Sequence, residues 1–251
     1  MRGEYGRAGL VGVLTPQANM TVEPELSVLM PPDVGMLAAR LVCPARTLQE
    51  RLAVYLEELP RTLERFDDAP LDLVAFACTG SSYILGPERE AAVLARCNRP
   101  VLTAASAIAD TLAELRARRV LLVSPYPGWL TESALAHWTM SGIEVTHVVS
   151  PPAVPKGLHP IYAQTSAGVL AALEGVDRRG VDAVLVTGTG MPTLAALATL
   201  NDGKGPPALS SNLCLAWRMA ARLGLRADWL SADAPWKARL AARHPSAGAP
   251  A

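Results

Sequence analysis

The stretch VAFACTGSSYILG, Val74–Gly86, decides the fold of this chain. It begins as a continuous apolar run, which is typical of a strand buried on both faces of a parallel sheet. The run ends at Cys78, and four small or hydroxylated residues follow. A side chain at this position lies at the edge of the sheet where α/β proteins bind ligands. The pattern favours a functional thiol; a small buried cysteine without a role is the alternative.

The rest of the chain alternates between similar apolar runs and helical stretches. Helical stretches such as residues 50–66 and 105–119 are rich in Ala, Leu and Arg. This alternation predicts an α/β protein with parallel sheets. The expected strands are residues 8–14, 35–42, 71–77, 100–103, 119–124, 144–150, 182–187 and 207–211.

Landmarks of the first half recur in the second half in the same order and at nearly the same spacing. They are Thr15, Cys78 and Thr103 in the first half, and Ser124, Gly188 and Ser210 in the second. The shared order predicts two pseudo-symmetric, doubly wound parallel-sheet halves, with the active site in the cleft between them.

The repeat also predicts how the chain is divided. Residues 1–115 form an N-terminal half that carries Cys78, and residues 116–235 form a C-terminal half that carries the Gly188 loop. Residues 236–251 are expected to form a partly disordered tail, because the end of the chain is small and Pro-rich.

The composition argues against several classes of protein. A formal net charge of zero disfavours a broad attraction to nucleic acid or to an anionic membrane. No apolar run reaches the roughly 18–20 residues of a membrane helix, and the N-terminus does not resemble a secretory signal. The four cysteines lack CxxC spacing, which fits a reduced, cytoplasmic compartment. A homo-oligomer is compatible with these observations.

The residues after Cys78 offer the chemistry of an anion-binding turn. Thr79, Gly80 and Ser81 supply closely spaced backbone amides and hydroxyls. Such donors bind a carboxylate and favour a thiolate over a thiol.

Two further candidates follow the first strand of each half. Asn19 has an amide that suits a carboxylate or carbonyl, unless it serves only its own loop. Tyr126 follows the equivalent strand of the second half, and its hydroxyl could donate to a substrate oxyanion. Thr21 is expected to cap the helix after Asn19.

The second-half loop carries Gly188, Thr189 and Gly190. Its partial GxGxxG pattern lacks the third glycine, so a dinucleotide site is set aside. The amides and hydroxyls of residues 187–189 are instead expected to form a second anion cradle. His159 is a weak candidate for the cleft rim, and the histidine spacings do not suit a metal. A metal site is therefore not expected.

Several of these motifs together resemble a known family. The chain from about Gly9 to Leu225 follows the motif order of the maleate cis–trans isomerase and arylmalonate decarboxylase family, within the aspartate/glutamate racemase superfamily. The motifs are PQANMTVEPE (16–25), ACTGSSY (77–83), SPY (124–126), the Gly188 loop and LSSNLCLAW (209–217). The resemblance implies two α/β halves, no cofactor, and a small dicarboxylate in the interdomain cleft.

The chain departs from that family in its cysteines. The superfamily's racemases and isomerases usually carry one cysteine in each half, whereas here Cys78 matches the first and Gly188 occupies the second position. Arylmalonate decarboxylases show the mirror arrangement, with one cysteine in the second half. Racemisation needs an acid/base group on each face of the substrate, so a single thiol makes it the less favoured activity.

Three functions remain open at this point. The leading one is a cofactor-independent isomerase that acts on a small unsaturated dicarboxylate, with Cys78 as nucleophile. The alternative is a decarboxylase of a substituted malonate, with Cys78 as proton donor. The third is an inactive small-carboxylate binding protein. Apolar Met20, Met191 and Leu194, near the expected cleft, hint at a substrate substituent larger than hydrogen.

Overall fold

The computed structural model describes residues 4–243, which form two four-stranded parallel sheets. The strand order is β2-β1-β3-β4 in the first sheet and β6-β5-β7-β8 in the second. The strands are β1 (Gly9–Pro16), β2 (Val34–Leu41), β3 (Leu73–Phe76), β4 (Val101–Thr103), β5 (Arg119–Val123), β6 (Glu144–Val149), β7 (Ala183–Val186) and β8 (Ala208–Ser210). All eight expected strands are present, within one or two residues of their expected bounds.

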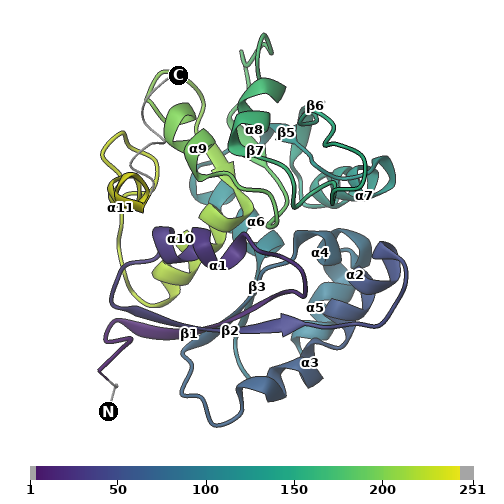
Figure 1. Cartoon of the computed structure of the whole chain (residues 1–251), viewed down its shortest axis with the longest axis vertical. Coiled ribbons are helices and arrows are strands. Elements are labelled where there is room, and N and C mark those ends of the chain that lie inside the picture. The colour runs from purple at the N-terminus through teal and green to yellow at the C-terminus, as the bar shows by residue number, and fades with distance from the viewer. Residues whose placement is uncertain (1–3, 244–251) are drawn as a thin grey trace.

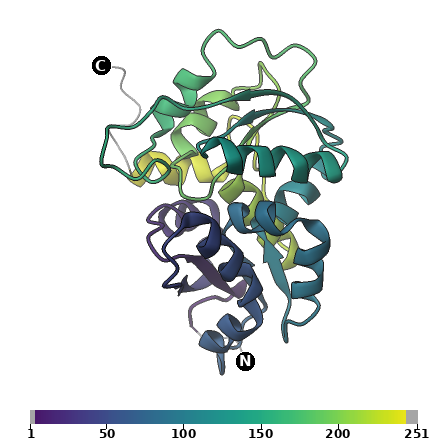
Figure 2. The ribbon, with the colours of Figure 1, turned by 90° about the vertical axis from the view of Figure 1, so that its right-hand side faces the viewer.

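Helices flank both sheets, and the two halves lie one above the other (Figures 1 and 2). The helices of the first half are α1 (Val22–Leu29), α2 (Leu48–Glu57), α3 (Leu59–Thr62), α4 (Thr79–Leu85), α5 (Pro87–Leu94) and α6 (Ala104–Glu114), with a 3-10 turn, η1, at Leu63–Phe66. Those that follow are α7 (Gly128–Met140), α8 (Ser166–Ala172), α9 (Leu194–Leu200), α10 (Ser211–Arg222) and α11 (Pro235–Arg243). No helix within residues 4–243 is long and apolar enough to cross a membrane.

The identical strand order confirms the expected pair of similar α/β halves. The central strands β3 and β7 are buried at every residue, because helices cover both faces of each sheet. The equivalence extends to local chemistry at the end of each sheet. The hydroxyl of Thr103 accepts a hydrogen bond from the Ser106 amide at the start of α6. The hydroxyl of Ser210 accepts one from the Leu213 amide at the start of α10.

Helix α10 belongs to the second half in sequence but packs on the first half. It lies against α6 and α1, and it also reaches β3 and β4 (Figure 1). Just after it, Leu223 lies so close to Gly9 that a Cβ there would be 2.6 Å from the leucine side chain. The two halves therefore share a packed core, and the division at residues 115 and 116 stays a prediction.

The expected C-terminal tail is folded over part of its length. Residues 235–243 form α11, which contacts α1 and α9. Trp236 is buried, and its indole N–H donates to the Trp229 carbonyl at 2.9 Å. Arg239 donates to the carbonyls of Val28 and Leu29 at the end of α1. These contacts explain why a polar, Ala-rich sequence is ordered here; residues 244–251 lie outside the described residues.

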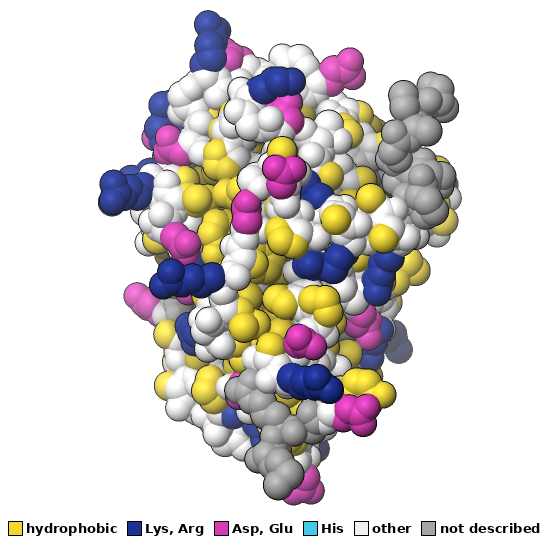
Figure 3. Space-filling model, turned by 90° about the vertical axis from the view of Figure 1, so that its left-hand side faces the viewer, with side chains coloured by type: hydrophobic (Ala, Val, Ile, Leu, Met, Phe, Trp, Pro, Cys, Tyr) yellow, Lys and Arg dark blue, Asp and Glu magenta, His cyan; other side chains and the backbone are white. Residues whose placement is uncertain are grey.

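The side of the molecule that carries α11 is mixed in character. Apolar side chains spread over the middle of this face, between scattered charged residues (Figure 3). A shallow groove here is lined by Met20, Leu194 and Leu240, together with neighbouring residues of α1, α9 and α11. Met20 is 69% exposed, so the side chain expected in the cleft lies on the outside instead.

A buried carboxylate joins the two halves. Glu25 of α1 is 6% exposed, and it accepts hydrogen bonds from the Thr193 hydroxyl and the Thr193 amide at the start of α9. The Leu194 amide donates to it at 3.2 Å. The Asn212 side-chain amide of α10 also donates to it, at 2.8 Å. Burial raises the pKa of this carboxyl, and the four donors oppose that rise.

We expect Glu25→Ala to lower the free energy of unfolding by about 3 kcal/mol, because it leaves several buried donors without an acceptor. The measurement is urea unfolding followed by circular dichroism. Glu132→Ala, at an exposed position of α7, is the matched control and should change stability by less than about 0.5 kcal/mol. If the two substitutions lowered the free energy of unfolding equally, the buried hydrogen bonds of Glu25 would contribute nothing to stability.

Candidate active site in the cleft between the halves

A pocket opens at the carboxyl ends of the central strands of both sheets. Its cavity volume is about 110 Å³. The strand orders place a topological switch point between β1 and β3 and another between β5 and β7, where chain crossovers leave room for a ligand. Of the candidates, the pocket is lined by Asn19, Cys78, Thr79, Gly80, Tyr126, Gly188, Thr189 and Gly190. The structure thus brings residues from four loops to one place.

Cys78 lies at the N-cap of α4 and is 4% exposed. Its sulfur accepts a hydrogen bond from the Ser81 hydroxyl at 3.2 Å. Burial raises the pKa of the thiol, while the Ser81 hydroxyl and the amides of Ser81 and Gly80 act to lower it. The expected anion-binding turn is the first turn of a helix instead. Ser81 does not line the pocket and acts from behind the sulfur.

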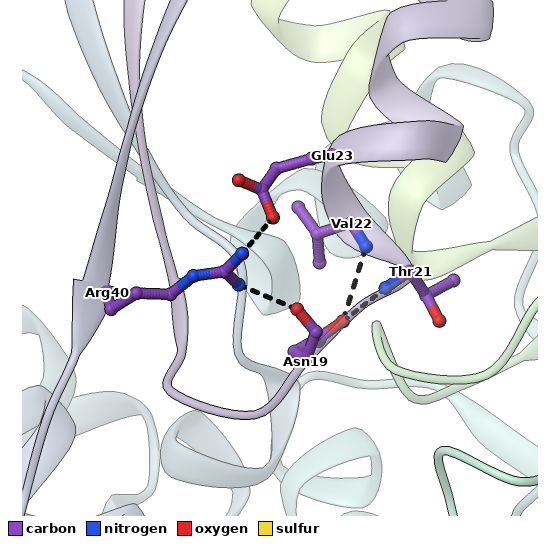
Figure 4. A network of polar contacts seen from close by, with 5 residues as sticks. All are labelled: Asn19, Thr21, Val22, Glu23 and Arg40. Atoms are coloured by element: carbon purple, nitrogen blue, oxygen red, sulfur yellow. Dashed lines mark hydrogen bonds and ion pairs between the residues drawn. The ribbon is translucent and has the colours of Figure 1, made fainter.

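Asn19 holds its own loop and also bridges the two halves. Its Oδ1 accepts from the amides of Thr21 at 2.9 Å and Val22 at 3.2 Å. Its Nδ2 donates to the Thr189 hydroxyl at 3.2 Å. Arg40 binds the Asn19 carbonyl at 2.7 Å and pairs with Glu23 (Figure 4). The side-chain oxygen is therefore engaged locally, and the amide nitrogen is the group that remains near the pocket.

The expected cap of α1 is wrong. The Thr21 side chain makes no capping hydrogen bond, and it donates to the Gly190 carbonyl at 2.7 Å. Asn19 supplies the capping oxygen instead, because its Oδ1 accepts from the two free amides and closes a local turn. Thr21 becomes a second link between the first-half loop and the second-half loop.

Tyr126 lies with its hydroxyl 2.6 Å from that of Thr79. Burial raises the pKa of this phenol well above its usual value. The group therefore stays neutral near pH 7, where it can donate a hydrogen bond but is a poor base. Its ring meets Tyr83 edge to face, with ring centroids 6.2 Å apart.

The second-half loop is more structural than expected. The Thr187 hydroxyl bonds that of Tyr83 at 2.7 Å, and the Thr189 hydroxyl donates to the Ala77 carbonyl at 2.9 Å. The Gly188 amide donates to the Ser211 hydroxyl at 3.1 Å. These groups are occupied by contacts within the protein, so the predicted anion cradle of residues 187–189 is not available in that form.

Gly188 has a conformation that explains its lack of a side chain. Its φ is +96°, and a Cβ there would lie 2.9 Å from Pro125 and 3.5 Å from the Tyr126 hydroxyl. Gly190 is equally constrained, since a Cβ would lie 2.4 Å from the Tyr162 ring. The wall opposite Cys78 is therefore filled by the Tyr126 and Tyr162 side chains.

Several pocket residues were missed by the sequence analysis. Helix α2 contributes Leu48, Arg51, Leu52 and Tyr55, which share one face at helical spacing. That spacing is visible in the sequence, but an apolar stripe of this kind is also what a core-facing helix shows. The other missed residues are Pro16, Gln17, Ala18, Leu130, Ile161 and Tyr162.

His159, the weak rim candidate, does line the pocket. Its ring stacks on Tyr162 with centroids 3.9 Å apart, and its Nδ1 accepts from the Ile161 and Tyr162 amides. Met191 and Leu194 are buried outside the pocket, so the expected apolar substituent site is not formed by them. Within residues 4–243, no cluster of three His, Cys, Asp or Glu side chains could hold a metal.

Comparison with known proteins agrees with this geometry. The profile of the arylmalonate decarboxylase family matches residues 11–233. A maleate isomerase of Geobacillus stearothermophilus is 27% identical over 233 residues, which cover 86% of this chain and 92% of that protein. The crystal structure of the maleate isomerase of Pseudomonas putida S16 superposes with a TM-score of 0.79 at 24% identity, and the match covers 89% of this chain and 98% of that one.

A further similar structure is the maleate cis–trans isomerase of Nocardia farcinica, solved as a cysteine-to-serine mutant with a covalently bound succinylcysteine intermediate. It is 25% identical, with a TM-score of 0.73 and coverage of 86% of this chain and 93% of that one. The fold and the site together define a two-half α/β protein with a thiol buried in its interdomain cleft. The chain belongs to the arylmalonate decarboxylase family.

The environment of Cys78 predicts how its reactivity depends on pH. A raised thiol pKa keeps the group protonated at neutral pH, so its alkylation by iodoacetamide should accelerate as pH rises above 7. Ser81→Ala removes a hydrogen bond that lowers the pKa, and should slow alkylation at pH 8 about three- to tenfold. Mass spectrometry of the Cys78 peptide provides the measurement.

Ser82→Ala is the control for this effect, since the neighbouring buried hydroxyl has no hydrogen bond to the sulfur. It should leave the pH profile of Cys78 unchanged. A profile that is flat from pH 6 to pH 9 would contradict the raised pKa of Cys78, and an equal response to the two substitutions would contradict the assigned role of Ser81.

The backbone conformation of Gly188 predicts how much stability is lost when a side chain is introduced there. Gly188→Ala should lower the free energy of unfolding by about 1–3 kcal/mol, because of its positive φ and the contact with Pro125. Gly128→Ala is the control, since it begins α7 with no atom within 4 Å of the added Cβ. Urea unfolding compares the two, and equal stabilities would exclude strain at Gly188.

Proposed function

We propose that this protein is a cofactor-independent cis–trans isomerase of a small unsaturated dicarboxylate of the maleate type. The observation that carries the proposal is Cys78, a buried thiol at the head of α4 that lines the pocket between the halves. Family membership and the maleate isomerases among its relatives support the same reading. The reaction needs one nucleophile and free rotation about one bond, and a single cysteine meets the first requirement.

The proposed reaction begins with addition across the double bond. The Cys78 sulfur bonds to one alkene carbon as the π bond opens, and the other alkene carbon takes a proton, which balances the proton lost by the thiol. The former double bond is now single and rotates. Removal of that proton then re-forms the double bond in the trans arrangement as the carbon–sulfur bond breaks. The intermediate is a succinyl thioether, as in the Nocardia farcinica mutant.

The surrounding residues have distinct proposed roles. The Tyr126 hydroxyl, paired with Thr79, donates to a carboxylate oxygen on which negative charge grows during addition. The Nδ2 of Asn19 is a second donor at the pocket. Gly188, Thr189 and Gly190 contribute backbone atoms to the second-half wall, while Gly80 and Ser81 supply amides near the sulfur.

A malonate decarboxylase is the second candidate, and one observation favours it. Burial keeps the Cys78 thiol protonated at neutral pH, which suits a group that gives a proton to a carbanion once carbon dioxide has left. The family profile also bears the name of that activity. In this reading the proton arrives from the first-half wall, and the product is one enantiomer.

The setting of the enzyme is also part of the proposal. The four cysteines are free in the structure, and three of them are buried. Thiols that are kept unpaired suit a reducing compartment, so we place the protein in the cytoplasm. Its substrate is a small carboxylate; a protein that binds such a ligand without turnover is the third candidate.

Proton NMR in heavy water tests these candidates, with maleate, substituted maleates and substituted malonates as the panel. We expect the trans isomer of an unsaturated substrate to form, and Cys78→Ala to lower the rate at least about 10³-fold, as loss of a nucleophile does. Cys97→Ala removes a half-buried thiol outside the pocket and should leave the rate unchanged.

Each other outcome has a defined meaning. Loss of one carboxylate with incorporation of one deuterium would replace the isomerase by the decarboxylase. Turnover that survives in Cys78→Ala would contradict the role of the thiol in either enzyme. Binding without turnover of any compound in the panel would favour the third candidate, a carboxylate-binding protein without activity.

A further inference from the structure

Arg51 is the one permanently charged side chain among the described residues that line the active-site pocket. It projects from α2, on the face that also carries Leu48, Leu52 and Tyr55. Leu52 packs against the first turn of α4, where a Cβ on Gly80 would meet it at 3.1 Å. The helix that bears Arg51 is therefore fixed against the helix that begins at Cys78.

The guanidinium of Arg51 lacks a partner in the part of the chain that the structure describes. Its Nε is buried without a hydrogen bond, and none of the ion pairs within residues 4–243 includes it. Other arginines of the first half are paired, as Arg40 is with Glu23 and Arg89 with Glu57. A buried donor left unpaired costs free energy, which is recovered if a ligand supplies the acceptor.

Arg51 and the thiol both act on the same two tyrosines of the pocket. Tyr55 and Tyr162 both have pKa values raised by burial first, and raised further by the negative charge of a Cys78 thiolate. The Arg51 guanidinium acts on the same two phenols in the opposite direction. Arg51 is not among the groups that shift the pKa of Cys78 itself. The two tyrosines thus lie within reach of both the thiol and the cation.

We propose that Arg51 binds the carboxylate of the substrate that lies farther from Cys78, and so makes the pocket selective for dianions. The inference rests on the proposed function, because it assumes that the substrate carries two carboxylates. The guanidinium fork matches a carboxylate with two parallel hydrogen bonds. Because the thiol is protonated and the phenols are neutral, the positive charge of Arg51 also offsets part of the negative charge of a dianionic substrate.

Tyr55 and Tyr162 line the same pocket as Arg51 and Cys78. His159, stacked on Tyr162, has a pKa lowered by burial first and by the Arg51 charge second. It is therefore neutral near pH 7 and does not compete with Arg51 for the anion. A substrate that bonds covalently at one end and pairs with Arg51 at the other would be held while its central bond rotates.

The test is calorimetric binding to the Cys78→Ala protein, which removes the nucleophile and isolates affinity. The probes are maleate and its diamide, which has the same carbon skeleton and no carboxylate. We expect Arg51→Met to weaken maleate binding about 10- to 100-fold and diamide binding at most about threefold. Arg61→Met, which removes the same charge from an exposed position outside the pocket, should leave both affinities unchanged.

Three results would overturn the assignment: absence of maleate binding to the parent, unchanged binding in Arg51→Met, or equal loss of both ligands. Arg51→Lys guards against misfolding, because it keeps the charge and should retain most of the preference for maleate. Failure of the proposed function is seen separately, in the NMR panel. If maleate affinity depends on Arg51 but no isomerisation occurs, only the isomerase proposal is contradicted. If isomerisation occurs but Arg51→Met leaves maleate affinity unchanged, only the Arg51 assignment is contradicted.

Discussion

The buried carboxylate of Glu25 is the interaction on which the arrangement of this protein depends. It lies on a first-half helix and accepts hydrogen bonds from Thr193 and Leu194, at the start of a second-half helix, and from Asn212. Asn212 in turn donates to the Thr189 carbonyl at 3.0 Å, in the loop that forms one wall of the pocket. A carboxylate that is removed from water needs all of these donors, so it fixes the distance and orientation between the halves.

The contacts between the halves also explain which pocket residues are structural and which can meet a ligand. Thr187, Thr189 and the Gly188 amide are engaged in contacts that hold the walls together, so they form a rigid scaffold. The groups at the cavity include the Cys78 thiol, the Tyr126 hydroxyl, the Asn19 side-chain amide and the Arg51 guanidinium. A side chain at Gly188 is disfavoured, because φ is positive there and a Cβ would lie 2.9 Å from Pro125. The site is therefore asymmetric, with covalent chemistry available from one wall only.

Much of the fold and part of the site could be predicted from the sequence. The eight strands are visible because strands buried on both faces form continuous apolar runs, and the order of landmarks revealed the repeat. Cys78, Asn19 and Tyr126 were found because they follow strand ends, where parallel sheets collect their functional loops. Arg51 and Tyr55 were missed because they lie in the middle of α2, where a pocket-facing stripe and a core-facing stripe have the same period.

The sequence by itself determined the two-half α/β architecture, the loops that meet in the cleft and the single thiol at the head of α4. These features depend on local periodicity and on the positions of residues relative to strand ends, which are properties of short segments. Only the tertiary structure decided which polar groups face the cavity, because each hydroxyl and amide has a choice between a neighbour in the protein and a ligand. Thr21 and Thr189 bond across the halves, over separations of more than a hundred residues, while Arg51 is left without a partner in the described chain. Such long-range pairing depends on how the two halves pack, and no short segment encodes it.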